Sequence, residues 1–248
     1  MSAEWVVITG ASRGIGLAAA KRLLAAGGRV VAAARDIDKL KEAYSFCDEE
    51  AVRLISWDFS EPGKFQGFAD KVMDEAGPVR GLVYCAGIQL TLPLSMSKPD
   101  LARKIFGLNT FSAMEAVRCF SKKNIASSEG ASFVLISSLS AREGALGQSL
   151  YGASKGALEG FLPAAAAELA QRNIRLNCIA PGLVKTDMSA EFLDRMTPDQ
   201  RTKLESAYPL GFGEPEDVAA MIEWLLSPAS RWVTGQIYVM DGGHSITA

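Results

Sequence analysis

The sequence predicts an α/β fold in which one doubly wound parallel sheet lies between two layers of helices, within a single domain of residues 1–248. Short, apolar, β-branched runs alternate with longer helical patterns, which is the order that βαβ crossovers produce. The apolar runs are continuous instead of alternating with polar residues, which indicates strands buried on both faces. No solenoid-type repeat and no linker interrupts this order, so the pattern favours one domain.

The predicted elements follow one another closely along the chain. Strand-like runs are Trp5–Thr9, Arg29–Ala34, Val52–Trp57, Gly81–Cys85, Ser132–Ser137, Ile174–Ile179 and Gln236–Met240. Helical patterns are Ile15–Ala26, Ile37–Tyr44, Phe65–Glu75, Leu101–Phe120, Tyr151–Arg172 and Pro215–Leu226. A doubly wound sheet binds ligands beyond the carboxyl ends of its strands, so we expect the functional site there.

Composition argues against several classes of function. Hydrophobic residues make up 48% of the chain, and the net charge of -2 gives no electrostatic footprint for nucleic acid or an anionic membrane surface. No signal-peptide pattern and no apolar run of roughly 18–20 residues is found, so we expect a soluble, cytoplasmic protein. One histidine, His244, cannot form a multi-His metal site, and four scattered cysteines predict reduced thiols and no metal.

A glycine-rich segment joins the first predicted strand to the first helix. It reads TGASRGIG from Thr9, a GxxxGxG spacing. Glycines permit a tight turn and close approach of the backbone to a pyrophosphate, and the helix N-terminus offers N–H groups to the anion. A plain βα turn is the alternative, which the position after the first strand disfavours. The predicted dinucleotide contacts are Gly10, Ser12, Arg13, Gly14, Ile15 and Gly16.

The end of the second strand favours NADP(H) over NAD(H). An NAD site places an acid there to bind the ribose 2′-OH, whereas this strand ends at Ala34 and is followed by Arg35. A guanidinium suits a 2′-phosphate, and Arg13 is placed to contact the same phosphate from the glycine-rich loop. If the alignment slips by two residues, Asp36 becomes the ribose acid and NAD(H) becomes the alternative.

Tyr151 and Lys155 stand at positions i and i+4 of a predicted helix, so their side chains share one face. A free tyrosine has a pKa near ~10, and a nearby ammonium stabilises the phenolate and lowers that pKa. A tyrosine tuned in this way exchanges a proton with an alcohol oxygen while a nicotinamide exchanges hydride. The YxxxK pattern alone is weak and gains its meaning from the glycine-rich segment.

These segments together resemble the short-chain dehydrogenase/reductase family of compact type, with a Rossmann fold, over nearly the whole chain. The matching segments are TGASRGIG, Asp58, Cys85–Gly87, Asn109, Ile136–Ser138, YGASK from Tyr151, Pro181–Gly182 and Thr186. The resemblance implies that Ser138 polarises the substrate oxygen, Tyr151 acts as acid and base, and Lys155 binds the nicotinamide ribose and lowers the Tyr151 pKa. Ser137 and Ser140 lie close enough to leave the choice of serine open.

The resemblance also implies further site residues and an assembly. Asn109 orders a water that links Lys155 to solvent, Asp58 meets the adenine, and Thr186 holds the carboxamide. Phe59, Ala86, Gly87, Pro181, Gly182 and Val184 complete the predicted cofactor site. The helices that begin near Leu101 and Tyr151 are implied to form a homotetramer, or at least a homodimer.

Three positions depart from the family pattern. The usual NNAG segment reads Tyr84-Cys85-Ala86-Gly87, so the role of its asparagines has to be met otherwise. Pro163 lies inside the helix of Tyr151 and predicts a kink or widened turn. A basic residue expected after Gly211, in a segment that resembles 3-oxoacyl-acyl-carrier-protein reductases, is missing.

The polar stretch Ser189–Phe212 interrupts the strand–helix alternation and predicts a substrate lid within the domain. We expect Arg142, Glu143, Leu146 and Gln148 on one wall of the substrate site, and Met188, Phe192, Leu193 and Met196 on the other. The expected activity is NADP(H)-dependent interconversion of a ketone and a secondary alcohol, of the 3-oxoacyl reductase or a related carbonyl reductase type. The alternatives are an NAD-dependent alcohol or hydroxysteroid-type dehydrogenase, a lyase or epimerase, and a catalytically silent NADP(H)-binding sensor.

Overall fold

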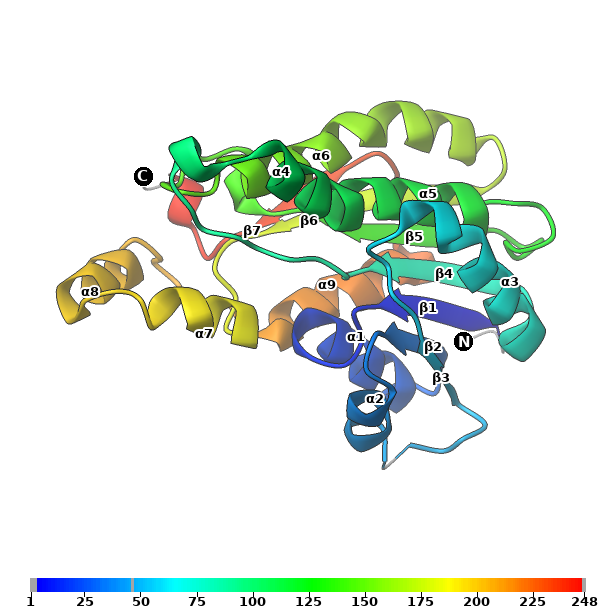
Figure 1. Ribbon diagram of the computed structural model, residues 1–248. Helices are drawn as coiled ribbons and strands as arrows, with labels where there is room; N and C mark the ends of the chain where they lie inside the picture. The colour runs from blue at the N-terminus through cyan, green and yellow to red at the C-terminus, as the bar shows by residue number, and fades with distance from the viewer. Residues whose placement is uncertain (1–3, 46, 247–248) are drawn as a thin grey trace.

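A computed structural model describes residues 4–45 and 47–246 and confirms the doubly wound α/β fold. The described residues form a seven-stranded parallel sheet in the order β3-β2-β1-β4-β5-β6-β7 (Figure 1). The strands are β1 Trp5–Thr9, β2 Arg29–Ala34, β3 Val52–Ser56, β4 Val79–Tyr84, β5 Ala131–Ile136, β6 Ile174–Pro181 and β7 Ile237–Met240. The predicted strands β1 and β2 are confirmed at both ends.

Helices cover both faces of the sheet. They are α1 Gly14–Ala25, α2 Ile37–Ala43, α3 Phe65–Ala76, α4 Pro99–Phe106, α5 Ser112–Phe120, α6 Ser149–Ala170, α7 Asp187–Leu193, α8 Pro198–Ser206 and α9 Pro215–Leu226. Buried side chains of α3, α5 and α6 share one core with the sheet, and those of α1, α2 and α9 share the other. The two cores account for the continuous apolar strands, because each strand is covered on both faces.

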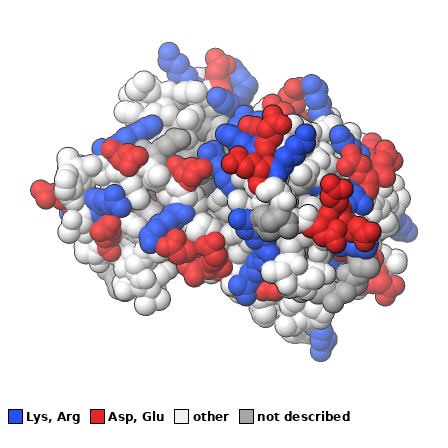
Figure 2. Space-filling model, turned by 90° about the horizontal axis from the view of Figure 1, so that it is seen from below, with Lys and Arg blue, Asp and Glu red and all other residues white. Residues whose placement is uncertain are grey.

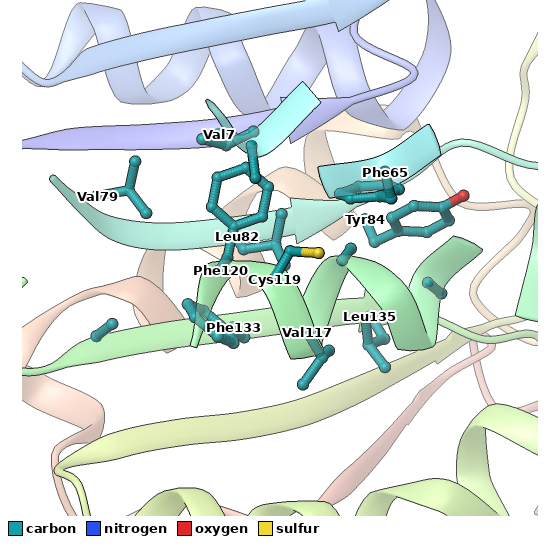
Figure 3. Close-up of a cluster of buried hydrophobic side chains, with 14 of the residues drawn as sticks. Val7, Phe65, Val79, Leu82, Tyr84, Val117, Cys119, Phe120, Phe133 and Leu135 are labelled. Atoms are coloured by element: carbon teal, nitrogen blue, oxygen red, sulfur yellow. The ribbon is translucent and has the colours of Figure 1, made fainter. Parts of the chain in front are cut away.

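The first of these cores is built around aromatic rings. Leu82 and Phe133 point from the sheet toward Phe65 and Phe120 of the covering helices (Figure 3). The Phe65 and Phe120 rings meet edge to face, with centroids 6.2 Å apart. Burial of such large side chains supplies much of the hydrophobic stabilisation of a domain.

The long helix expected over Leu101–Phe120 is divided. α4 and α5 are separated by a π-helical turn, Gly107–Phe111, and the Tyr84 hydroxyl donates to the Leu108 carbonyl in this turn at 2.8 Å. π turns are rare and occur mostly at functional sites. By contrast, α6 continues as an α-helix through Pro163, so the prediction of a widened turn there is wrong. Pro163 lies on the exposed side of α6.

The predicted lid contains the helices α7 and α8, which project at the left of Figure 1. Each begins with a capping box, Thr186 with Ser189 on α7 and Thr197 with Gln200 on α8. The caps satisfy the first N–H groups of two short helices that bury little surface of their own.

The order of the strands places the site. The chain runs outward from β1 to β2 and β3 and then returns to β4 on the other side of β1, so the crossovers diverge between β1 and β4. Such a point leaves a crevice at the carboxyl ends of the strands.

On the face drawn in Figure 2, Lys and Arg side chains alternate with Asp and Glu, and no extended patch of one sign is visible there.

Candidate functional site

A cavity of about 470 Å³ lies at the carboxyl edge of the sheet. It is lined by every residue assigned to the cofactor from the sequence: Gly10, Ser12, Arg13, Gly14, Ile15, Gly16, Arg35, Asp58, Phe59, Ala86, Gly87, Pro181, Gly182, Val184 and Thr186, with Tyr151 and Lys155. Ser138 also lines it, whereas Asn109 is fully buried behind it. One cavity therefore brings together residues that were predicted from separate motifs.

The glycine-rich loop requires its glycines. Gly10 has φ 66°, and a Cβ on it would lie 2.9 Å from the Ala86 nitrogen. A Cβ on Gly16 would lie 2.5 Å from the Gly10 carbonyl oxygen. The buried Tyr44 hydroxyl donates to the Ala11 carbonyl at 3.0 Å and supports the loop from beneath. The glycines thus let the loop pack closely on its own backbone and on the end of β4, at the N-terminus of α1 where a diphosphate would bind.

Thr9 meets part of the role of the asparagines missing from the family pattern. Its hydroxyl oxygen accepts from the backbone nitrogens of Cys85 at 3.2 Å and Ala86 at 3.1 Å, which ties the end of β1 to the end of β4. Burial raises the pKa of the Cys85 thiol to about 12, so this side chain stays neutral beside Lys155.

The end of β2 carries cations at the cavity wall. Arg35 and Lys39 both line the cavity, and Lys39 was not predicted from the sequence, although it lies four residues beyond Arg35. The Asp36 carboxylate caps α2 by accepting from the Asp38 and Lys39 nitrogens, each at 3.1 Å. Asp36 also lines the cavity. Across the cavity mouth, Arg13 pairs with the exposed Asp187 at 3.2 Å.

Asp58 follows β3 at the same end of the cavity. Its carboxylate accepts from the Ser60 nitrogen at 2.9 Å, and this bond, with Arg35 nearby, holds the pKa of Asp58 below its ordinary value. Next to it, the Phe59 ring packs edge to face on Phe68 with centroids 5.0 Å apart, so the wall at this end is rigid.

Lys155 and Tyr151 share one face of α6, as predicted. The Lys155 side chain is buried, its Nζ donates to the Ile136 carbonyl at 2.7 Å, and it lies 6.0 Å from the Tyr151 ring centroid. Burial lowers the pKa of Lys155 to about 8, which leaves it mostly protonated at neutral pH.

The pKa of Tyr151 differs from the expectation. Burial raises it above its ordinary value, and hydrogen bonding with the Ser138 side chain only partly offsets this effect. The expected lowering by Lys155 is therefore not found, because the phenolate would be desolvated and the ammonium is engaged with the Ile136 carbonyl. Tyr151 holds its proton at neutral pH.

The structure distinguishes the three serines that follow β5. The buried Ser137 hydroxyl donates to Glu159 at 2.9 Å, and the Ser140 hydroxyl donates to Gln148 at 2.7 Å. All three serines line the cavity, and the Ser138 side chain hydrogen-bonds with Tyr151, while its hydroxyl oxygen accepts from the Ser140 nitrogen at 3.2 Å.

Asn109 lies within the π turn and serves a structural role in the described residues. Its amide donates to the Ile88 carbonyl at 2.9 Å and to the Ser154 hydroxyl at 3.1 Å, and its Oδ1 accepts from the Ile88 nitrogen at 2.9 Å. A Cβ on Gly87 would contact both Asn109 Oδ1, at 3.2 Å, and Lys155 Nζ, at 3.6 Å. The asparagine thus shapes the chain directly beside the lysine.

The predicted walls of the substrate site are only partly confirmed. Glu143, Gln148, Met188 and Phe192 line the cavity. Leu146 is 97% exposed, Arg142 bonds Glu159 at 2.9 Å, and neither they nor Leu193 and Met196 belong to the lining. Three lining residues were not predicted from the sequence: Leu204 and Tyr208, at the end of α8, and His244, in the chain after β7.

The fold and the cavity define a dinucleotide-binding α/β protein with a serine, a tyrosine and a lysine at the carboxyl edge of its sheet. A family model described as Enoyl-(Acyl carrier protein) reductase matches residues 10–245. Carbonyl reductase family member 4 of Xenopus tropicalis is 34% identical over 95% of both chains, and human 3-oxoacyl-[acyl-carrier-protein] reductase is 32% identical over 95% of both.

Solved structures agree with these matches. A short-chain type dehydrogenase/reductase from Mycobacterium ulcerans has a TM-score of 0.90 and 31% identity, covering 98% of this chain and 90% of its own. ElxO with NADP bound has a TM-score of 0.86 and 26% identity, covering 98% and 99%. The chain belongs to the short-chain dehydrogenase/reductase family, a family of oxidoreductases.

The part of the chain that the structure describes contains neither a membrane-spanning helix nor a cluster of metal-binding side chains. Its helices include none with the length and apolarity needed to cross a membrane. Nor do its His, Cys, Asp and Glu side chains gather in threes as a metal site would require.

The glycine-rich loop yields a test. We expect Gly16→Ala to weaken NADPH binding by at least about tenfold, because the added methyl group displaces the Gly10 backbone from its approach to a diphosphate. NADPH fluorescence titration measures the effect. Gly160→Ala is the matched control, since a Cβ there meets no atom within 4 Å. Equal affinities for the two variants would contradict the assignment of the loop.

Proposed function

We propose that this protein is an NADP(H)-dependent oxidoreductase that interconverts a ketone and a secondary alcohol. The observation that carries the proposal is the presence of Ser138, Tyr151 and Lys155 in the same cavity as the glycine-rich loop. Two separate requirements, a proton-transfer group and a cradle for a diphosphate, thereby meet at one place.

The residues present fit a bound NADP(H). Gly10 and Gly16 allow the close backbone packing that shapes the loop at the N-terminus of α1, and both line the cavity. Arg35, Lys39 and Arg13 supply positive charge for a 2′-phosphate, and the solved structure of ElxO with NADP bound is a precedent at 26% identity. Asp58 with Phe59 would hold the adenine, and Thr186 with Pro181, Gly182 and Val184 the carboxamide. When bound, the nicotinamide supplies or accepts the hydride.

Ser138 and Tyr151 act on the substrate oxygen. In reduction, the Ser138 hydroxyl donates a hydrogen bond to the carbonyl oxygen and polarises it, and the Tyr151 hydroxyl transfers its proton to that oxygen as hydride reaches the carbon. The substrate would leave as the alcohol, and Tyr151 would be left as a tyrosinate, which then regains a proton. Because burial raises the pKa of Tyr151, the free protein holds the proton that reduction of a ketone requires.

Lys155 provides the positive charge that stabilises the tyrosinate. Its Nζ donates to the Ile136 carbonyl, which leaves two further N–H groups for the ribose hydroxyls and the relay. Asn109 shapes the adjoining chain, and we assign it the ordering of a water between Lys155 and solvent. Glu159 braces this arrangement from α6, because it accepts from Ser137 and from Arg142 on the segment that carries Ser138.

The relatives indicate which substrates to try. They include a carbonyl reductase family member and 3-oxoacyl-[acyl-carrier-protein] reductases, so 3-oxoacyl thioesters and simple ketones come first. The matching family model is described as an enoyl reductase, which makes reduction of a 2-enoyl thioester the second candidate.

We also propose that the segment 189–212 closes over the substrate and that α4, α5 and α6 form a homotetramer or homodimer interface.

Tyr151→Phe tests the proposed chemistry. We expect NADPH-dependent reduction of acetoacetyl thioester, ethyl acetoacetate or cyclohexanone to fall by about 10²–10⁴-fold, because the proton donor is removed, while NADPH binding is retained. Steady-state absorbance at the NADPH band measures the rate, and Tyr238→Phe is the control. Turnover that survives in Tyr151→Phe would exclude Tyr151 as the acid; no turnover by the wild-type protein would favour the silent sensor.

Arg35→Ala tests the choice of cofactor. We expect the KM for NADPH to rise by about tenfold or more while that for NADH changes little, because a charge-assisted bond to the 2′-phosphate is lost. The exposed Lys41, on the same helix as Lys39 and outside the cavity lining, gives the control Lys41→Ala. Equal effects on both cofactors would contradict the 2′-phosphate assignment and favour NAD(H).

The pKa of Lys155 predicts a pH profile for reduction. Below about pH 8 the ammonium is charged and the tyrosinate is stabilised; above it the charge is lost. We therefore expect kcat/KM, which reports the free protein, to fall as pH rises through about 8. Lys155→Met should remove this limb together with most of the activity. A wild-type profile that stays level to about pH 9.5, more than one unit above that value, would contradict the role of the charge.

A further inference from the structure

The chain's one histidine joins three segments at the substrate end of the cavity. His244 follows β7, and its Nε2 lies 3.2 Å from a carboxylate oxygen of Glu143, in the loop after β5. Its Nδ1 lies 2.8 Å from the carbonyl oxygen of Ala207, at the end of α8. The imidazole ring stacks on Tyr208 with centroids 4.4 Å apart and an interplanar angle of 12°.

The two polar contacts place both ring nitrogens of His244 against oxygen atoms. A carbonyl oxygen only accepts hydrogen bonds, and so does an ionised carboxylate. A neutral imidazole carries one N–H, so one of its nitrogens would then direct a lone pair at an oxygen 2.8 or 3.2 Å away. Both contacts are attractive only when both nitrogens are protonated. An imidazolium facing an ionised Glu143 makes both contacts attractive at once.

The neighbouring contacts hold this arrangement in place. Asp241 accepts from the nitrogens of Gly243 at 3.0 Å and Ser245 at 2.8 Å, which sets the turn that carries His244 and adds negative charge beside it. The Tyr208 hydroxyl oxygen accepts from the Leu183 nitrogen at 3.2 Å, and this fixes the ring beneath the imidazole. His244 is half-buried and lines the cavity together with Glu143 and Tyr208.

We propose that His244 is a positioning residue that closes the substrate end of the cavity and limits the length of the carbonyl substrate. As an imidazolium it holds the loop of Glu143 and the end of α8 together through its two ring nitrogens, so this wall of the cavity is shut by hydrogen bonds and by stacking. The limit on substrate length rests on the proposed function, whereas the protonation of His244 is argued from its contacts alone.

A spectroscopic experiment tests the protonation of His244 without turnover. Tag-free protein labelled with ¹⁵N-histidine contains one imidazole, and long-range ¹⁵N–¹H spectra at pH 7 report the protonation of each ring nitrogen. We expect both nitrogens of His244 to be protonated in the wild type. In Glu143→Gln we expect a neutral ring protonated at Nδ1, because the amide N–H then donates to Nε2 and both contacts persist. A neutral ring in the wild-type protein would overturn the proposal.

A substrate series tests the closure. With NADPH and ethyl 3-oxobutanoate, 3-oxooctanoate and 3-oxododecanoate, we expect His244→Ala to raise the ratio of kcat/KM for the longest to the shortest ester by about tenfold or more. Glu143→Ala should do the same, Glu143→Gln should retain the wild-type ratio, and Lys203→Ala, at an exposed position of α8 outside the cavity lining, is the control. An unchanged ratio in both alanine variants would overturn the closure. If the wild-type protein reduces none of the esters, the proposed function fails, while the ring spectrum still decides the ionic contact.

Discussion

The site depends on one buried cation and the carbonyl that receives it. Lys155 is only 4% exposed, and a charge this far from water is tolerated when it is hydrogen-bonded. The Ile136 carbonyl at the end of β5 provides that bond at 2.7 Å, which places the ammonium beside Tyr151 and beneath Gly87. The same burial that lowers the lysine pKa raises that of Tyr151, so the resting pair is an ammonium with a neutral phenol.

The parallel sheet explains how residues far apart in the chain reach this cation. Every strand ends at the same edge, so the glycine-rich loop after β1, Cys85–Gly87 after β4 and Ser138 after β5 become neighbours. Side chains then lock the strand ends together, as Thr9 does between β1 and β4. Glu159 does the same between α6 and the segment of Ser138, so the spacing within the site is fixed by the scaffold and not by mobile loops.

The fold and most of the site were predictable because each depends on a local pattern. Continuous apolar runs marked β1 and β2 to the residue, and the spacing of Tyr151 and Lys155 placed both on one face of α6. Features that depend on contacts between distant segments were not predictable. The π turn at Gly107–Phe111 has no pattern of its own, the Tyr151 pKa depends on burial, and His244 gains its role from Glu143 and Ala207.

The central claim, that a buried and hydrogen-bonded lysine supplies the charge beside Tyr151, is tested most directly by titrating that lysine. Protein labelled with ¹³C at the lysine Cε positions shows one resonance for each lysine, and the resonance absent from Lys155→Met identifies Lys155. The account predicts that this resonance titrates near pH 8, below the ordinary lysine value of 10.5. A titration at the ordinary value, together with the exposed lysines, would contradict it.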